Sequence, residues 1–124
     1  MTDWSVFAVA ALALAAWFGF KRLSWISSNR ARSCLRDGAL VVDVRTPAEF
    51  FGRHLPGAVN LPLDNLLNAA QRQLPDKQRV ILLHCLSGTR SDIARRLLSS
   101  QGYRQVFNLG SFGRAQKIVQ MGPG

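Results

Sequence analysis

The stretch that decides the fold is VILLHCLSGTRS, which runs from Val80 to Ser91. It begins with a continuous apolar run, which is typical of a strand buried on both faces of a parallel sheet. A loop with one glycine follows, and the residues after it have the spacing of a helix over 91–100. The stretch therefore predicts a strand, a loop and a helix in succession, with Cys85 placed where the strand ends.

Strands and helices alternate on both sides of this stretch. The β-branched run Ala39–Val44 predicts a second buried strand, and weaker strands are expected at 58–61 and 105–109. Helices are expected over residues 30–36, 64–73, 91–100 and 111–120. This alternation predicts an α/β fold, an open parallel sheet with helices on both faces, in which ligands bind at the carboxyl ends of the strands.

The first part of the chain is apolar and lacks charge. Seventeen residues from Trp4 to Phe20 contain one serine, one glycine and no other polar side chain. A helix of that length extends about 26 Å, close to the roughly 30 Å of the hydrocarbon core of a membrane. The sequence therefore predicts a transmembrane helix over residues 4–23, a juxtamembrane linker over 24–31 and one folded domain over 32–124.

Two other interpretations of the apolar segment are weaker. A cleaved signal peptide has a positive n-region, whereas the only charged side chain before the segment is that of Asp3. A buried core helix that is apolar on every face needs more surrounding protein than this chain provides. One span predicts a single-pass membrane protein, and because all sixteen Lys and Arg residues lie at or after Lys21, the positive-inside rule predicts that its amino terminus faces out. Its domain is expected in the cytoplasm, at the inner membrane if the protein is bacterial.

The net charge and the cysteine count narrow the possible functions. Sixteen basic against seven acidic residues give a formal charge of +9, and 48% apolar residues predict a folded core. Nucleic acid is not the expected partner, because topology already explains the basic residues near the apolar segment and no aromatic-basic motif is present.

Cys34 and Cys85 are expected to be free thiols in a reducing compartment. With no CxxC motif and no suitable histidine spacing, we expect neither a metal nor a cofactor.

Cys85 is the candidate nucleophile. A loop that turns into a helix directs several backbone N–H groups at one point, where the helix dipole adds positive potential. This environment stabilises a thiolate and lowers the pKa of the cysteine. The candidate substrate-binding residues are those of the loop: Leu86, Ser87, Gly88, Thr89 and Arg90. Residue chemistry alone leaves open whether the thiolate attacks sulfur, attacks an oxyanion such as phosphate or arsenate, or is an inert buried cysteine.

Three separated motifs resemble the rhodanese family. The first, Asp37–Phe50, contains a segment similar to the D-x-R segment of the family, and the second, His54–Pro62, is similar to its HIPGA-x-N signature. The third is the six-residue loop from Cys85 to Arg90. The motifs occur in the order of the family, and the resemblance extends from about residue 32 to about residue 118.

The resemblance implies a rhodanese-like sheet and sulfurtransferase chemistry. Cys85 would take a sulfane sulfur from thiosulfate, or from a low-molecular-weight or protein persulfide, and pass it to a thiophilic acceptor, which can be a protein. A loop of six residues is the length associated with sulfur substrates, whereas the related phosphatases have one residue more. Asp43 and Arg45, which match the D-x-R segment, are implied to hold the loop in place rather than to react.

The sequence also departs from the family pattern. Leu86 and Ser87 stand where well-known thiosulfate enzymes of the family carry cationic side chains, so thiosulfate is not necessarily the physiological donor. Arg53 replaces a usual glycine, and Ser111 and Ala115 alter the usual ending of the domain. Two alternatives therefore stay open: a non-catalytic, membrane-tethered binding module, and an oxyanion enzyme, either a phosphatase or an arsenate reductase.

The two histidines are expected to have structural roles. His84 precedes the nucleophile on a strand, so its side chain is expected on the opposite face of the sheet from that of Cys85. His54 lies in the second motif and is expected to stabilise a turn. Neither histidine is therefore the expected general base.

Overall fold

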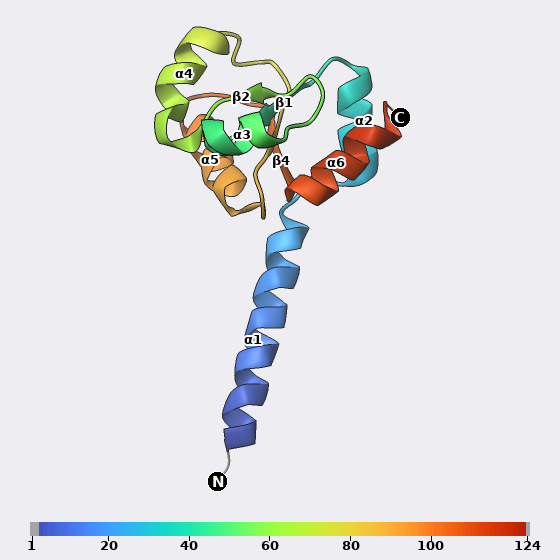
Figure 1. The fold of residues 1–124 in the computed structure, drawn as a ribbon, viewed down its shortest axis with the longest axis vertical. Coiled ribbons are helices and arrows are strands. Elements are labelled where there is room, and N and C mark those ends of the chain that lie inside the picture. Colours follow the sequence, from blue (N-terminus) through green and yellow to red (C-terminus); the bar gives the residue numbers. More distant parts are fainter. Residues whose placement is uncertain (1–2, 124) are drawn as a thin grey trace.

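The domain is built on a parallel sheet, in a computed structural model that describes residues 3–123 (Figure 1). The strands are β1 (Leu40–Asp43), β2 (Val59–Asn60), β3 (Ile81–His84) and β4 (Val106–Gly110). Their order in the sheet is β2-β1-β3-β4 and every pair is parallel, which confirms the predicted α/β architecture. The carboxyl ends of the strands therefore share one edge of the sheet, where a ligand site is expected.

Helices pack on both faces of this sheet (Figure 1). One face is covered by α2 (Ser28–Arg36) and α6 (Phe112–Met121). The other is covered by the 3-10 helix η1 (Leu63–Asn65), α4 (Leu66–Gln73) and α5 (Thr89–Ser100). Side chains alternate along the strands, so Val41 and Leu82 join the first layer while Val42 and Leu83 join the second. The result is one apolar cluster on each side of the sheet.

A short helix that the sequence analysis missed, α3 (Pro47–Gly52), follows β1. Thr46 caps this helix by accepting a hydrogen bond from the Glu49 N–H, while the Glu49 carboxylate accepts one from the Thr46 N–H. This reciprocal capping box, with proline at the first turn, is a local signal that predicts a helix start. The segment Thr-Pro-Ala-Glu thus contained the information needed to place α3.

Helix α1 (Asp3–Leu23) projects away from the domain (Figure 1). None of its residues is buried, and its apolar side chains are exposed along the whole length. Among the described residues it is the one helix long and apolar enough to cross a membrane. Its bounds agree closely with the transmembrane segment expected over residues 4–23.

The segment between α1 and α2 is attached to the domain. The Ile26 N–H donates to the Asn108 carbonyl at 2.9 Å, and the Ile26 side chain is buried. Ser27 caps α2, which begins at Ser28, two residues before the predicted start of that helix. Part of the stretch expected as a linker over 24–31 therefore packs on β4 and α6, because its apolar residues complete the cluster on that face.

Candidate active site

Cys85 lies at the carboxyl end of β3, directly before the loop that leads into α5. Its side chain is fully buried. The Gly88 N–H donates to Sγ at 3.0 Å, and the Ser91 hydroxyl donates to Sγ across 3.4 Å. Gly88 has a φ of +95°, a conformation that glycine adopts readily and that turns the loop around the sulfur. The predicted cradle of donors is therefore present at Cys85.

The surroundings of the thiol favour its thiolate. Burial raises the pKa of Cys85, but the Ser91 hydroxyl and the N–H groups of Ser91, Gly88 and Ser87 together lower this pKa below its usual value. The amino terminus of α5 adds positive potential at the same place. Both effects increase the share of the thiolate form, which is the nucleophilic form of a cysteine.

A buried polar network behind the loop involves Asn108 of β4, which the sequence analysis missed. The Asn108 side chain donates to the Gly88 carbonyl at 3.0 Å and accepts from the Ser91 hydroxyl at 2.7 Å. Its oxygen also accepts from the Gly110 N–H at 2.9 Å. The Ser91 hydroxyl has one hydrogen, which it donates either to Asn108 or to Cys85. When it donates to a Cys85 thiolate, the Gly110 N–H still satisfies the Asn108 oxygen. A single asparagine inside an otherwise apolar strand was the available signal.

Arg90, the last residue of the loop expected from the sequence, lies in the first turn of α5 and forms an ion pair with Glu49 of α3. The two side chains meet in a bidentate arrangement at 2.7 and 3.0 Å, and each is about one-third exposed. The Arg90 guanidinium, with the hydrogen bonds from Thr46, lowers the pKa of Glu49 from 4.5 to about 2. The charge of Arg90 is therefore largely compensated, and Glu49 is a second site residue that sequence reasoning missed.

Asp43 and Arg45 form a buried ion pair beside the loop residues but do not contact them directly. The Arg45 guanidinium donates to Asp43 at 2.7 Å and to the Arg53 carbonyl at 2.6 Å. Within residues 3–123, the side-chain hydrogen bonds of the pair reach none of residues 86–90. The pair therefore joins β1 to the end of α3, and its expected role in holding the loop stays a prediction.

The two histidines occupy structural positions. His84 is fully buried on the opposite face of the sheet, where its ring packs against Phe112 with centroids 5.6 Å apart. Burial lowers the pKa of His84, so the ring is neutral near pH 7. His54 stacks on Phe50 and its Nδ1 lies 2.8 Å from the Phe50 carbonyl oxygen. Both histidines therefore have the packing roles that the sequence indicated.

The end of α1 and the residue Trp25 lie against the outer side of the loop. The Trp25 ring is so close to Gly88 and Gly110 that a Cβ at these positions would lie 2.6 Å and 2.5 Å from ring carbons. The Lys21 ammonium donates to the Thr89 hydroxyl at 2.6 Å. Sequence reasoning placed neither residue at the site, because a turn between α1 and α2 is needed to bring them there.

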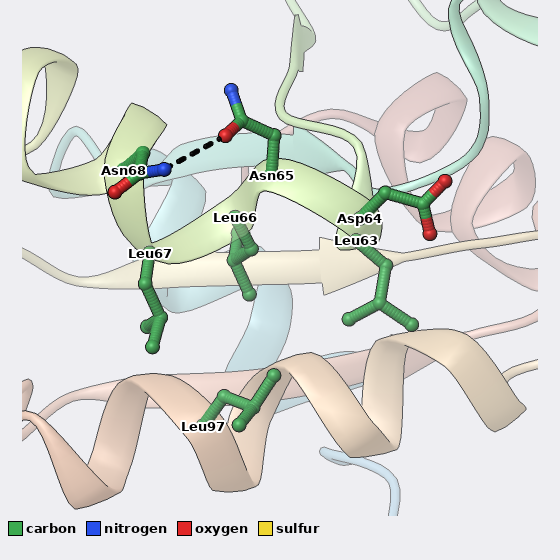
Figure 2. A pocket seen from close by; sticks show the side chains of 7 residues that line it. All are labelled: Leu63, Asp64, Asn65, Leu66, Leu67, Asn68 and Leu97. Atoms are coloured by element: carbon green, nitrogen blue, oxygen red, sulfur yellow. Dashed lines mark hydrogen bonds between the residues drawn. The ribbon is translucent and has the colours of Figure 1, made fainter.

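Several hollows lie in the surface, and three of them bear on the site. One of about 230 Å³ lies between η1, α4 and α5 and is lined largely by leucines and asparagines (Figure 2). It contains neither a cation nor a thiol, so we assign no chemistry to it. Two others border the loop: Ser87 lines a hollow of about 260 Å³ and Thr89 one of about 360 Å³. Residues of α1 form the other wall of both.

Known proteins are similar to this chain in sequence and in fold. The family model described as the rhodanese-like domain matches residues 27–113. Thiosulfate sulfurtransferase PspE of Escherichia coli is 35% identical over 69 residues, which are 56% of this chain and 66% of PspE, slightly less than two thirds. Thiosulfate sulfurtransferase GlpE of Pseudomonas syringae pv. syringae is 31% identical over 90 residues, which are 73% of this chain and 80% of GlpE.

A solved structure agrees with these sequence matches. The human single-domain sulfurtransferase TSTD1 superposes with a TM-score of 0.65 at 28% identity and covers 76% of this chain and 96% of its own. The chain belongs to the rhodanese-like domain family. The relatives described above are named as sulfurtransferases.

Proposed function

We propose that this chain is a rhodanese-type sulfurtransferase that moves a sulfane sulfur through a persulfide on Cys85. One observation carries the proposal. Sγ of Cys85 accepts a hydrogen bond from the Gly88 N–H at 3.0 Å and lies 3.4 Å from the Ser91 hydroxyl, close to the amino terminus of α5. These donors stabilise a thiolate and, after sulfur uptake, the terminal sulfur anion of a persulfide. The names of PspE and GlpE support sulfur as the transferred element.

The reaction has two balanced steps. The Cys85 thiolate attacks the outer sulfur of thiosulfate, so a bond forms between Sγ and that sulfur. The sulfur–sulfur bond of the donor breaks and sulfite leaves with the electron pair. A thiophile such as cyanide then attacks the terminal sulfur of the persulfide, forms thiocyanate and returns the Cys85 thiolate. The donors of the loop serve both steps, because each step begins or ends with a sulfur anion at the same point.

The sulfur donor and the sulfur acceptor have to bind at a loop that carries little uncompensated charge. Leu86 and Ser87 are exposed and uncharged, and Arg90 is paired with Glu49. The substrate classes that fit are a small sulfur-containing anion such as thiosulfate, and a persulfide of low molecular weight or on a protein. The acceptor is a thiophile, and a sulfur-acceptor protein is included in this proposal.

We also propose that α1 anchors the protein as a single-pass membrane helix with the domain on the cytoplasmic side. Helix α1 is apolar and unburied, and the basic residues follow it. Protease added to sealed inside-out membrane vesicles should then digest the domain, whereas protease added to intact spheroplasts should leave it whole. Release of the domain into the soluble fraction without α1 would instead identify the segment as a cleaved signal.

The activity is tested by thiocyanate formation. Wild-type protein supplied with thiosulfate or glutathione persulfide, and with cyanide, should form thiocyanate, and Cys85→Ser should form none. Cys34→Ser is the matched control and should keep the wild-type rate, because Cys34 lies in α2 on the opposite face of the sheet. Hydrolysis of an aryl phosphate by the wild type would favour the oxyanion enzyme. A folded protein active in neither assay would favour the binding module.

A further inference from the structure

Two guanidinium groups lie over the Trp25 ring at the outer side of the loop, and the ammonium of Lys21 lines the same hollow as that ring. Lys21 and Arg22 come from the last turn of α1 and Arg114 comes from α6. The guanidinium carbons of Arg22 and Arg114 lie 6.0 and 5.6 Å from the centre of the Trp25 ring. Within residues 3–123, no carboxylate forms an ion pair with any of the three.

This cluster is electrostatically incomplete. Burial and the neighbouring charge of Arg22 lower the pKa of Arg114, so the two guanidinium groups repel one another. The indole N–H of Trp25 is buried and has no hydrogen-bond partner among the described residues. Like charges and an unsatisfied N–H donor next to one ring form an environment that favours a bound anion.

The loop itself lacks the charge that an anionic donor needs. Residues 86–89 carry none, and Arg90 is bound to Glu49 in a bidentate pair. A dianion that approaches the Cys85 thiolate is repelled unless cations lie beside its path. A cation of α1 reaches the loop directly, since Lys21 donates to Thr89 at 2.6 Å.

A hollow joins these cations to the loop. Phe18, Lys21, Arg22 and Trp25 line it on one side and Ser87 lines it on the other, and its volume is about 260 Å³. Ser87 is two residues from Cys85. The two cations supply the charge-assisted hydrogen bonds that the oxygens of a sulfur-containing anion accept.

We propose that Lys21 and Arg22 bind the anionic end of the sulfur donor and so make the end of α1 part of the active site. The inference rests on the proposed sulfurtransferase function and deepens it. In the first step, the outer sulfur of thiosulfate forms its bond with Sγ of Cys85 while the sulfonate group stays beside Lys21 and Arg22. When the sulfur–sulfur bond breaks and sulfite leaves with the electron pair, the same cations still hold its oxygens, so they bind the ground state and the transition state equally.

The test is the thiosulfate dependence of thiocyanate formation by the full chain in nanodiscs of phosphatidylcholine. The double variant Lys21→Gln/Arg22→Gln should raise KM for thiosulfate about fivefold to tenfold, the size expected for losing two partly exposed charge contacts. Its kcat should stay within about twofold, because the donors around Cys85 are unchanged. The conservative double variant Lys21→Arg/Arg22→Lys should keep the wild-type KM.

The matched control is Lys77→Gln/Arg104→Gln, which removes the same two charges. Both residues are exposed and lie before β3 and β4, at the edge of the sheet opposite the loop. This control should leave KM unchanged. Equal KM values for the wild type and Lys21→Gln/Arg22→Gln would overturn the inference, and so would equal losses in both Gln double variants.

Two further outcomes distinguish donor binding from lipid binding and from failure of the sulfurtransferase function itself. If Lys21→Gln/Arg22→Gln keeps the wild-type KM in phosphatidylcholine nanodiscs and only removes a KM change that phosphatidylglycerol nanodiscs cause in the wild type, the cations serve lipid headgroups and the inference is wrong. If the wild type forms no persulfide at all, the proposed function fails and the inference fails with it. If wild type and double variant form the persulfide with the same thiosulfate dependence, the proposed function stands and only the role of α1 is rejected.

Discussion

The two sides of the Cys85 loop differ in how fully their polar groups are hydrogen-bonded. On the inner side, Ser91, Asn108 and Gly110 form a buried network in which each polar group has a partner. On the outer side, Lys21 and Trp25 contact the loop from a segment that leaves the domain, and the indole N–H of Trp25 has no hydrogen-bond partner among the described residues. We call these the inner support and the outer cover. The inner support sets the reactivity of the sulfur, whereas the outer cover affects what reaches it.

The largest effect is expected from Asn108→Ala in the inner support. The change leaves the Gly88 carbonyl and the Gly110 N–H buried without their side-chain partner. Each such group costs about 1–3 kcal/mol, so the free energy of unfolding should fall by about 3 kcal/mol. Urea unfolding of the full chain in a mild detergent, followed by near-UV circular dichroism, measures it.

The matched control for this change is Asn68→Ala. Asn68 is exposed on α4, and its side chain donates only to Asn65. Its loss should change the free energy of unfolding by less than about 0.5 kcal/mol. Similar losses in Asn68→Ala and Asn108→Ala would mean that burial of the network is not what stabilises the loop.

The next effect is expected where the outer cover touches the loop, at Gly88→Ala. The positive φ strains any alanine, and its Cβ would lie 2.6 Å from a Trp25 ring carbon. Together these should cost about 2 kcal/mol or more, measured by the same unfolding experiment. Gly38→Ala shares a similar φ of +91° but has open space around it, so it should cost only the backbone strain.

A double variant separates the two causes in Gly88→Ala. Adding Trp25→Ala removes the ring and should restore the part of the stability lost to the collision, leaving a cost close to that of Gly38→Ala. If Trp25→Ala restores nothing, the ring does not lie against Gly88. The contact between the outer cover and the loop would then be wrong.

A smaller effect, about tenfold on rate, is expected from Ser91→Ala. Loss of the hydroxyl removes one of the donors that lower the pKa of Cys85, so less thiolate is present at pH 7. A hydrogen bond to a charged group is worth about 1.5 kcal/mol, which corresponds to about tenfold in the amount of thiolate. Alkylation by iodoacetamide at pH 7 in a Cys34→Ser background should slow about tenfold. Ser99→Ala, at an exposed position on the same helix, should react at the unchanged rate.

The smallest effect is expected at the partly exposed Glu49–Arg90 pair. The pKa of Glu49 is about 2 in the folded protein against 4.5 without its partner. The pair therefore stabilises the fold fully above pH 4.5, and this contribution disappears as the pH falls toward 2. Solvent screening limits it to about 1 kcal/mol.

This pH dependence is measured by comparing the wild type with Glu49→Gln. The difference in the free energy of unfolding should be about 1 kcal/mol at pH 7 and should shrink below pH 4.5. Asp64→Asn, at an exposed carboxylate of η1, serves as the control and should show no such difference. A Glu49→Gln difference that stays constant from pH 7 to pH 3 would contradict the ion pair.

The sequence predicted the parts of the site that local pattern determines. Continuous apolar runs placed β1 and β3, and the loop with glycine placed Cys85 at the start of α5. The pairing of neighbouring strands was not local information. Asn108 reaches Gly88 because β4 pairs with β3, and no spacing along the chain connects residues twenty positions apart.

The contacts of the outer cover with the loop could not be predicted from the sequence pattern. Lys21 meets Thr89 across 68 positions, because the chain turns at residues 24–27 and Ile26 packs on the domain. A positive residue after an apolar helix is explained by membrane topology alone, so nothing in the pattern marked Lys21 for the active site. Glu49 differs, since its capping box was visible, but its partner Arg90 became apparent only in the structure.

The most direct test of the central claim is the intact mass of the full chain after incubation with thiosulfate or glutathione persulfide. We predict the gain of one sulfur mass on the wild type and on Cys34→Ser, its absence on Cys85→Ser, and its removal by cyanide with formation of thiocyanate. A folded wild-type protein that gains no sulfur from either donor would contradict the account. A sulfur adduct of equal yield on Cys85→Ser would contradict it as well, because the sulfur would then be carried elsewhere.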